Sequence, residues 1–187
     1  MHTVIFATTN TDKFATAQHT CTQYDISVVQ EVLDVPEIQG EDPERIAIDK
    51  ATKAFTLLQK PVVITDDSWS YAGLKGFPGA YMHSMNEWFT PEDFLRLVLP
   101  LTDRTATLTQ YLVYYDGSNH KIFSQQTQAR LLKEIRGKSQ HSNDTITVLD
   151  GDNGLSVAEV HAKKVDKSKR KSAQVWHEFS KWYRSTQ

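Results

Sequence analysis

Three carboxylates within the first 67 residues are the side chains best suited to chemistry. Asp66 and Asp67 are adjacent, and Glu37 lies in the acidic stretch 36–41. Adjacent carboxylates repel each other, so a cation makes their proximity favourable. A small set of oxygen ligands suits Mg²⁺, with Mn²⁺ as an alternative, because Mg²⁺ shares its coordination shell with substrate phosphates. Such a metal and one free carboxylate could orient and deprotonate a water for attack on phosphorus.

Asn10 and Lys13 offer a positive site that matches these carboxylates. They follow the apolar run 3–7, which predicts a buried strand, and they begin a segment whose apolar residues recur at helical spacing. Free backbone N–H groups at the start of a helix favour a phosphate, and the Lys13 ammonium adds a positive charge. The pair therefore predicts a phosphate contact.

The elements expected around these residues form an α/β fold with a mixed sheet. Asp66 and Asp67 are expected just past a strand, where ligands bind in open α/β sheets. Helices alternate with strands in the first half of the chain, and a β-rich segment follows. The expected strands are 3–7, 27–35, 62–64, 105–115, 120–129 and 145–149, and helices are expected to begin near residues 11, 43, 91 and 175.

Size and composition fit one domain over residues 1–187, and the pattern also allows a small β-rich lobe around 103–140. The net charge of −2 gives no reason to expect a nucleic-acid partner. Apolar runs are too short for a membrane span. The single cysteine, Cys21, excludes an intrachain disulfide and argues against a cysteine-based zinc site. A cytoplasmic protein without a membrane partner is therefore expected.

Each of these pieces alone is also typical of ordinary structure. A Thr-Thr-Asn-Thr turn commonly connects a strand to a helix, and Asp-Asp-Ser is common in solvated turns. An acidic stretch such as 36–41 is a common surface loop. Only the joint placement of these pieces at predicted strand ends favours the functional interpretation.

Four segments together resemble the inosine triphosphate pyrophosphatases, a Maf/Ham-like family of enzymes that convert unusual purine triphosphates to monophosphates and pyrophosphate. Segment 6–13 looks like the family's Thr-Gly-Asn-x-x-Lys motif, and 35–41 resembles its Pro-Glu-x-Gln-Gly-Glu segment. The helix around 48–51 is similar as well. Segment 64–81 resembles the Asp-Asp-Ser-Gly and Gly-x-Pro-Gly-x-Tyr signature. The likeness covers roughly residues 3–100, and the order and spacing fit.

The resemblance implies an elongated mixed β-sheet flanked by helices, a homodimer, and attack between the α and β phosphates. It implies that Glu37 and Asp66 hold Mg²⁺ together with Asp67. Asp67 would also orient or activate the attacking water, and Lys13 would assist it. The residues implied to bind the triphosphate substrate are Thr8, Thr9, Asn10, Lys13, Lys50, Ser68, Lys164, Ser168, Lys169 and Arg170.

The second half of the chain departs from the family where the base is recognised. The stretch 142–146 stands where the family carries Phe-Gly-Tyr/Trp-Asp-Pro, whose aromatic residue stacks on the purine. Lys169 replaces the His of a Ser-His-Arg motif. Thr9 replaces a Gly, and Trp69 stands where many members have Gly. Trp69 or Trp88 is a conceivable substitute for the stacking aromatic.

Three functional hypotheses follow from this combination. The first is an active Mg²⁺-dependent nucleoside triphosphate pyrophosphatase acting on unusual purine nucleotides such as ITP or XTP, with an altered base preference. The second is a catalytically degenerate relative that binds a nucleotide or a protein partner. The third is a general phosphatase that recognises only the phosphates. The acidic set favours the first hypothesis, and the altered 142–146 loop favours the second.

Overall fold

A computed structural model describes residues 2–33, 35–163 and 173–186. The chain divides into two compact units, and strands β3, β5 and β6 contribute residues to both. The first unit contains Met1–Asp67, Gln110–Gln125 and Lys167–Gln187, and the second contains Ser68–Thr109 and Gln126–Asp166.

The first unit alternates strands and helices. Asn10 caps α1 and Asp42 caps α2, with Pro43 in the first turn of α2, and both helices begin where the sequence predicted. Its elements are β1 (His2–Ala7), α1 (Thr11–Thr22), β2 (Ile26–Glu31), α2 (Pro43–Leu58), the first part of β3 (Val62–Tyr71), parts of β5 (Thr105–Tyr115) and β6 (His120–Leu131), and α6 (Gln174–Ser185).

The second unit holds the remaining residues of those three strands and several short elements. Thr90 and Asp93 form a reciprocal capping box at the start of α4. Pro91 follows Thr90 in the first turn of this helix. The elements are the 3₁₀ turn η1 (Ala72–Leu74), β4 (Pro78–Gly79), α3 (Met82–Trp88), α4 (Pro91–Val98), η2 (Ser142–Thr145), β7 (Thr147–Leu149) and α5 (Val157–Ala162).

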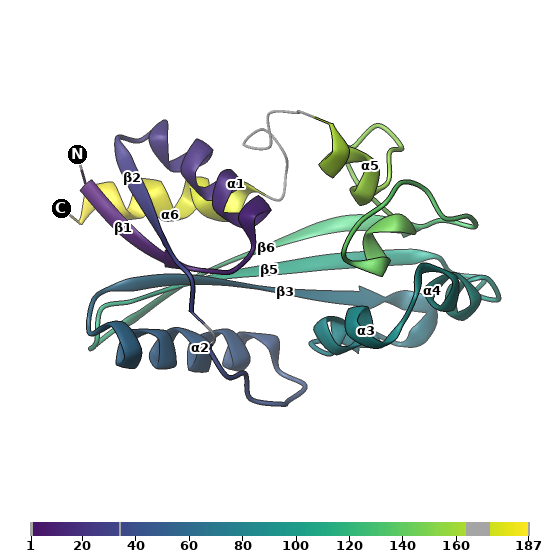
Figure 1. The fold of residues 1–187 in the computed structure, drawn as a ribbon, viewed down its shortest axis with the longest axis horizontal. Helices are drawn as coiled ribbons and strands as arrows, with labels where there is room; N and C mark the ends of the chain where they lie inside the picture. The colour runs from purple at the N-terminus through teal and green to yellow at the C-terminus, as the bar shows by residue number, and fades with distance from the viewer. Residues whose placement is uncertain (1, 34, 164–172, 187) are drawn as a thin grey trace. The chain divides into compact units, whose positions relative to one another are not determined.

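The strands form a mixed sheet in the order β2-β1-β3-β5-β6-β7, with β4 paired to β3. Strand β1 runs parallel to both β2 and β3, whereas β3–β4 and β6–β7 are antiparallel. The α/β class and the mixed sheet expected from the sequence are therefore confirmed. Figure 1 shows the succession of strands and the helices that flank them.

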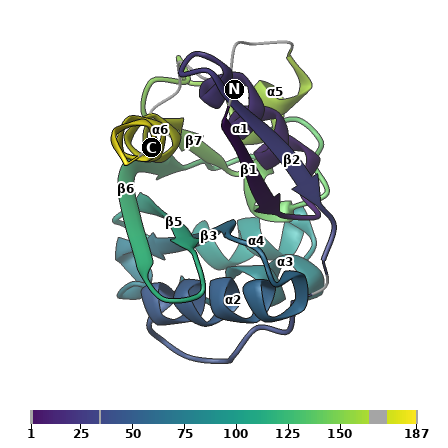
Figure 2. The ribbon, with the colours of Figure 1, turned by 90° about the vertical axis from the view of Figure 1, so that its left-hand side faces the viewer.

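Both faces of the sheet in the first unit are covered. Helices α1 and α6 lie over one face and α2 over the other, as Figure 2 shows. The α1/α6 side buries Phe6, Val63 and Leu112 against Trp176 and other α6 residues. The α2 side buries Val62, Ile64 and Val113 against alanines of the helix. Successive residues of β3 thus lie on opposite faces, which decides where its carboxylates point.

The core of the second unit forms around Trp69, Tyr71 and Phe94. Trp69 is only 7% exposed, so it packs in this core and is excluded as a free platform for a base. Trp88 at the end of α3 is 72% exposed. Among the described helices, none combines the length and the apolar character that a membrane crossing requires.

Three element predictions were wrong in detail. Strand β3 continues to Tyr71, so Asp66 and Asp67 lie inside it and not past its end. The polar run 65–68 hid this extension, although Trp69 pairs with Gly79 of β4. Strand β2 ends at Glu31 rather than at residue 35, and the stretch 142–145 is a 3₁₀ turn that leads into a shorter β7. Helices α3 and α5 were not predicted.

Candidate active site

The turn between β1 and α1 is held by its own side chains. Thr8 Oγ1 accepts a hydrogen bond from the backbone N–H of Asn10 at 3.1 Å, and Asn10 Oδ1 accepts one from the N–H of Lys13 at 2.9 Å. The backbone N–H of Thr8 donates to the Glu31 carbonyl of β2. Thr9 is exposed in this turn. The predicted phosphate-binding segment is therefore a fixed helix start, with Lys13 in its first turn.

Strand β3 points its two carboxylates to opposite faces of the sheet. Asp67 shares a face with Val63, which packs under α1 and α6. Asp66 shares the other face with Ile64, which packs over α2. Adjacent residues of a strand alternate in this way, so each carboxylate finds a partner on a different helix.

Lys13 is the partner of Asp67 on the α1 face. The distance from Lys13 Nζ to Asp67 Oδ2 is 3.0 Å, and the two side chains are 29% and 26% exposed. Burial lowers the pKa of Lys13, but the charges of Asp67, Asp66 and Glu37 together raise it above its usual value. Lys13 therefore stays protonated, as a phosphate-binding cation must.

Lys50 connects two carboxylates on the α2 face. Its ammonium forms a short ion pair with Glu37 Oε1, and its Nζ lies 3.9 Å from Asp66 Oδ1. The loop that carries Glu37 is also held by Lys53, whose Nζ donates to the Pro36 carbonyl at 2.9 Å. Lys50 was expected to approach the nucleotide, and its contact with both carboxylates was not predicted.

Asp66 lies where its negative charge is unfavourable. Its pKa is raised to about 6, mainly by burial and to a smaller extent by the charges of Asp67 and Glu37. Lys13 and Lys50 act in the opposite direction and do not fully offset the burial. An additional positive charge beside Asp66 would therefore be favourable.

The groups on the two faces approach each other where β1 stops. Ile5 pairs with Val62 and Phe6 with Val63, and β1 ends at Ala7. Asp66 and Asp67 thus extend beyond the end of their neighbouring strand. Lys13 on the α1 face accordingly interacts with Asp66 as well as with its ion-pair partner Asp67.

The predicted metal ligands do not form a closed cage. Within residues 2–33, 35–163 and 173–186, no three His, Cys, Asp or Glu side chains converge as a metal-binding group. Glu37 and Asp66 do converge on one positive charge, the Lys50 ammonium, and Asp67 faces Lys13 instead. A pair of carboxylates that shares one cation is suited to Mg²⁺, because Mg²⁺ can complete its coordination shell with phosphate oxygens and water.

Gln110 is a member of the site that the sequence did not reveal. Its Nε2 donates to Asp67 Oδ1 across 3.4 Å from the middle of β5. The surrounding stretch 105–115 predicted only a strand, and one glutamine in a strand carries no motif. The only available signal was its position two residues before Leu112, which places both side chains on the α1 face of the strand.

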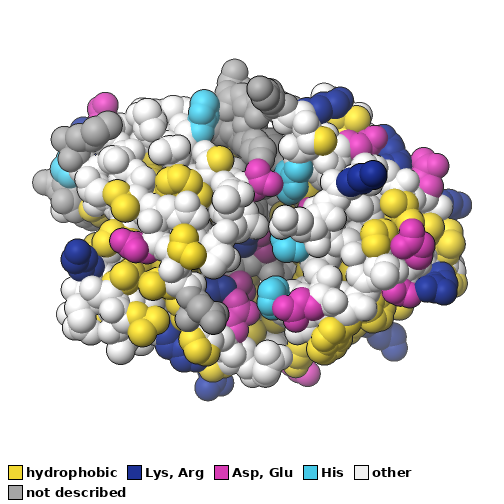
Figure 3. Space-filling model, viewed as in Figure 1, with side chains coloured by type: hydrophobic (Ala, Val, Ile, Leu, Met, Phe, Trp, Pro, Cys, Tyr) yellow, Lys and Arg dark blue, Asp and Glu magenta, His cyan; other side chains and the backbone are white. Residues whose placement is uncertain are grey.

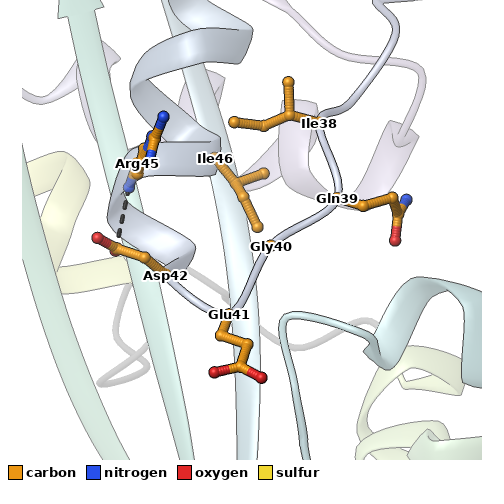
Figure 4. Close-up of a pocket in the computed structure, with 7 residues that line it drawn as sticks. All are labelled: Ile38, Gln39, Gly40, Glu41, Asp42, Arg45 and Ile46. Carbon is orange, nitrogen blue, oxygen red and sulfur yellow. Dashed lines mark hydrogen bonds between the residues drawn. The ribbon is translucent and has the colours of Figure 1, made fainter.

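A pocket of about 280 Å³ lies in the loop that follows Glu37. Figure 4 shows its wall, in which Ile38 and Ile46 are apolar and Gln39 and Glu41 are polar. Asp42 Oδ1 accepts hydrogen bonds from the N–H groups of Glu44 and Arg45. The α2 helix start is therefore already capped by a carboxylate, which disfavours an anion there.

The other residues implied by the resemblance have no described contact that assigns them to this group. Ser68 is buried and belongs to the second unit. The stretch 142–145 is buried, and Asn143 accepts a hydrogen bond there from the Tyr71 hydroxyl. The remaining predicted substrate contacts, Lys164, Ser168, Lys169 and Arg170, lie outside the described residues.

Positive side chains do not gather on the face seen in Figure 3. The Lys and Arg side chains of described residues lie mainly near the outline of that view. The described part of this face offers no continuous basic surface.

Comparison with known proteins places these residues in a family context. Residues 4–176 match the Ham1 family. The chain is 27% identical to a dITP/XTP pyrophosphatase of Methanopyrus kandleri over 97% of this chain and 96% of that protein. It is 30% identical to an inosine triphosphate pyrophosphatase of Ajellomyces capsulatus over 81% and 82%. The solved structure of a HAM1 protein from Coxiella burnetii has the same fold, with a TM-score of 0.78 at 20% identity over 99% of this chain and 100% of that one.

Proposed function

The chain belongs to the Ham1 family, and on this premise we propose that it is a nucleoside triphosphate pyrophosphatase, a hydrolase of acid anhydrides. The proposed reaction converts a purine triphosphate such as dITP, ITP or XTP to its monophosphate and pyrophosphate. Relatives that match nearly the whole chain carry the name dITP/XTP pyrophosphatase. That name supports the substrate class, and the residues of the site support the chemistry.

The observation that carries the proposal is the arrangement of two lysines and three carboxylates at the end of β1. Lys13 pairs with Asp67, and Lys50 pairs with Glu37 and Asp66. Hydrolysis of a phosphoanhydride needs cations that neutralise the phosphate oxygens and a carboxylate that accepts a proton from water. Both kinds of group are present here in one unit of the chain.

Each residue then has a role that follows from its contacts. Lys13 and the N–H groups at the start of α1 bind phosphate oxygens. Asp67, paired with Lys13, orients the attacking water and takes its proton. Lys50 neutralises charge on the other side of β3. Glu37 and Asp66 would hold Mg²⁺, which when bound supplies further neutralisation of the phosphates.

The resemblance also supports Mg²⁺ as the cation and a homodimeric assembly as parts of the proposal. The departures from the family in the stretch 142–146 and at Lys169 support an altered base preference. The short apolar runs and the single cysteine support a cytoplasmic location. A second candidate, a binding protein without catalysis, is favoured by one observation. The stretch 142–145, where the family resemblance implies a stacking aromatic, is a buried 3₁₀ turn without an aromatic residue.

The proposal is tested by incubating the chain with Mg²⁺ and a panel of triphosphates, namely ATP, GTP, dITP, ITP, XTP and an oxidised purine triphosphate. We expect pyrophosphate and the monophosphate as products, and the order of kcat/KM across the panel measures the base preference. Measurable nucleotide binding without any product would support the second candidate. Orthophosphate as the first product would support a phosphatase that recognises only the phosphates.

A further inference from the structure

The Asp67 carboxylate is contacted at both of its oxygens. Oδ2 lies 3.0 Å from Lys13 Nζ, and Oδ1 accepts the hydrogen bond from Gln110 Nε2 at 3.4 Å. These contacts come from different elements, since Lys13 is in α1 and Gln110 is in β5. A carboxylate held at one oxygen can still rotate about its terminal torsion, whereas contacts at both oxygens fix its plane.

The orientation of the Gln110 amide follows from the charge of its partner. An ionised carboxylate only accepts hydrogen bonds, so the NH₂ group of the amide must face Asp67 and the carbonyl must face away. The carbonyl oxygen Oε1 is buried and has no hydrogen-bond partner among the described residues. Thr65 Oγ1, two residues before Asp67 on the same face of β3, is buried without a described partner as well.

A buried carbonyl without a donor makes this glutamine unfavourable for the fold. A methionine at position 110 would occupy a similar volume and would bring no unsatisfied oxygen. The contact with Asp67 is the described feature of Gln110 that explains an amide at this place. Polar groups that lower stability in this way are expected where they serve a site.

We propose that Gln110 is a positioning residue that fixes the plane of the Asp67 carboxylate for attack by water, and that it does so at the expense of stability. The inference rests on the proposed function, in which Asp67 takes the proton of that water. It concerns a residue in β5 that does not itself bind the nucleotide.

The test compares Gln110→Met with Gln128→Met. Gln128 is a matched control because it also makes one side-chain hydrogen bond of 3.4 Å. Its Oε1 accepts this bond from Thr107 Oγ1 on an exposed part of β6. We expect Gln110→Met to lower kcat for pyrophosphate release by roughly ten- to a hundredfold with KM within about twofold, because misplaced catalytic groups act on the chemical step. Its thermal midpoint should be unchanged or higher, and Gln128→Met should leave kcat unchanged.

A fall in the thermal midpoint together with an unchanged kcat would show that Gln110 is merely structural and would overturn the inference. A double-mutant cycle with Asp67→Asn separates this outcome from failure of the proposed function. Should the wild-type chain release no product from any triphosphate, the proposed function fails, and the cycle is then read from thermal midpoints alone. Non-additive midpoints support the Gln110–Asp67 pair, and additive ones overturn it.

Discussion

At the scale of single residues, the site is a set of alternating charges in which each lysine has a carboxylate partner. Lys13 faces Asp67, and Lys50 faces Glu37 and Asp66. Two positive side chains among three negative ones leave a net negative charge. A divalent cation would offset this negative charge, and the lysines are placed to contact phosphate oxygens.

Asp66 should make the protein less stable as the pH rises through the weakly acidic range. Its pKa of about 6 in the folded chain is raised from 3.8, mainly by burial, so the folded state binds its proton more tightly than the unfolded state. Stability linked to this group is therefore fully present below about pH 4 and is lost as the pH rises to about 6. The expected loss is on the order of 1–3 kcal/mol.

Asp66→Asn removes this titration and provides the measurement. Unfolding free energies from urea titrations in chelator-containing buffer, between pH 4.5 and 7.5, should show the variant gaining stability over the wild type as the pH rises. A stability difference that does not change with pH would contradict the raised pKa of Asp66.

At the scale of elements, the site depends on β3 passing beyond the end of β1 between two helices. Alternation along β3 sends Asp66 to the α2 face and Asp67 to the α1 face. Helix α2 brings Lys50 to its face, and the capped start of α1 brings Lys13 to the other. Charged groups therefore lie on both faces of β3, and they approach each other where β1 ends.

Lys50→Met should weaken catalysis more than the loss of an ordinary surface lysine. Lys50 contacts the half-buried Asp66 and the exposed Glu37, and hydrogen bonds to charged groups contribute about 1.5–3 kcal/mol. We expect a roughly ten- to hundredfold fall in kcat/KM for pyrophosphate release. Lys121→Met is the control, because Lys121 is exposed and lies over the rings of Phe123 and Trp182 in the same unit. Equal effects of the two variants would refute the role of Lys50.

Much of the fold could be predicted from the sequence because its signals are local. The sequence predicted strand β1 and the starts of α1, α2 and α4 correctly. Apolar periodicity and Asn, Asp, Thr and Pro at helix starts act within a few residues, so these elements could be found locally. The extension of β3 through residues 65–71 could not be found in this way. It depends on pairing with β4, which is a non-local contact.

The candidate site divides in the same manner. Lys13, Glu37, Asp66 and Asp67 were predicted from motifs and from their expected position at strand ends. The sequence did not predict that Asp66 and Asp67 face opposite sides, because that follows from their position inside β3. Gln110 was missed because it lies more than 40 residues along the chain from Asp67, and only the sheet brings the two together.

At the scale of the whole molecule, the described residues of the candidate site lie in one compact unit. Asn10, Lys13, Glu37, Lys50, Asp66, Asp67 and Gln110 all belong to the first unit. The second unit contains the buried 142–145 turn, where the family resemblance implies base recognition. In the proposed function the phosphate chemistry depends on residues of the first unit, so it can be tested without knowledge of the base preference.

The most direct test of the account is the rate of pyrophosphate release by Asp67→Asn compared with Asp116→Asn. Both variants remove one negative charge from the first unit, but Asp116 lies in the β5–β6 turn, where its carboxylate accepts the N–H groups of Ser118 and Asn119. We predict that Asp67→Asn remains folded and lowers kcat by about a hundredfold or more, as expected on removal of a general base. Asp116→Asn should keep a kcat close to that of the wild type. An Asp67→Asn variant that retains activity within a few-fold of the wild type would contradict the account.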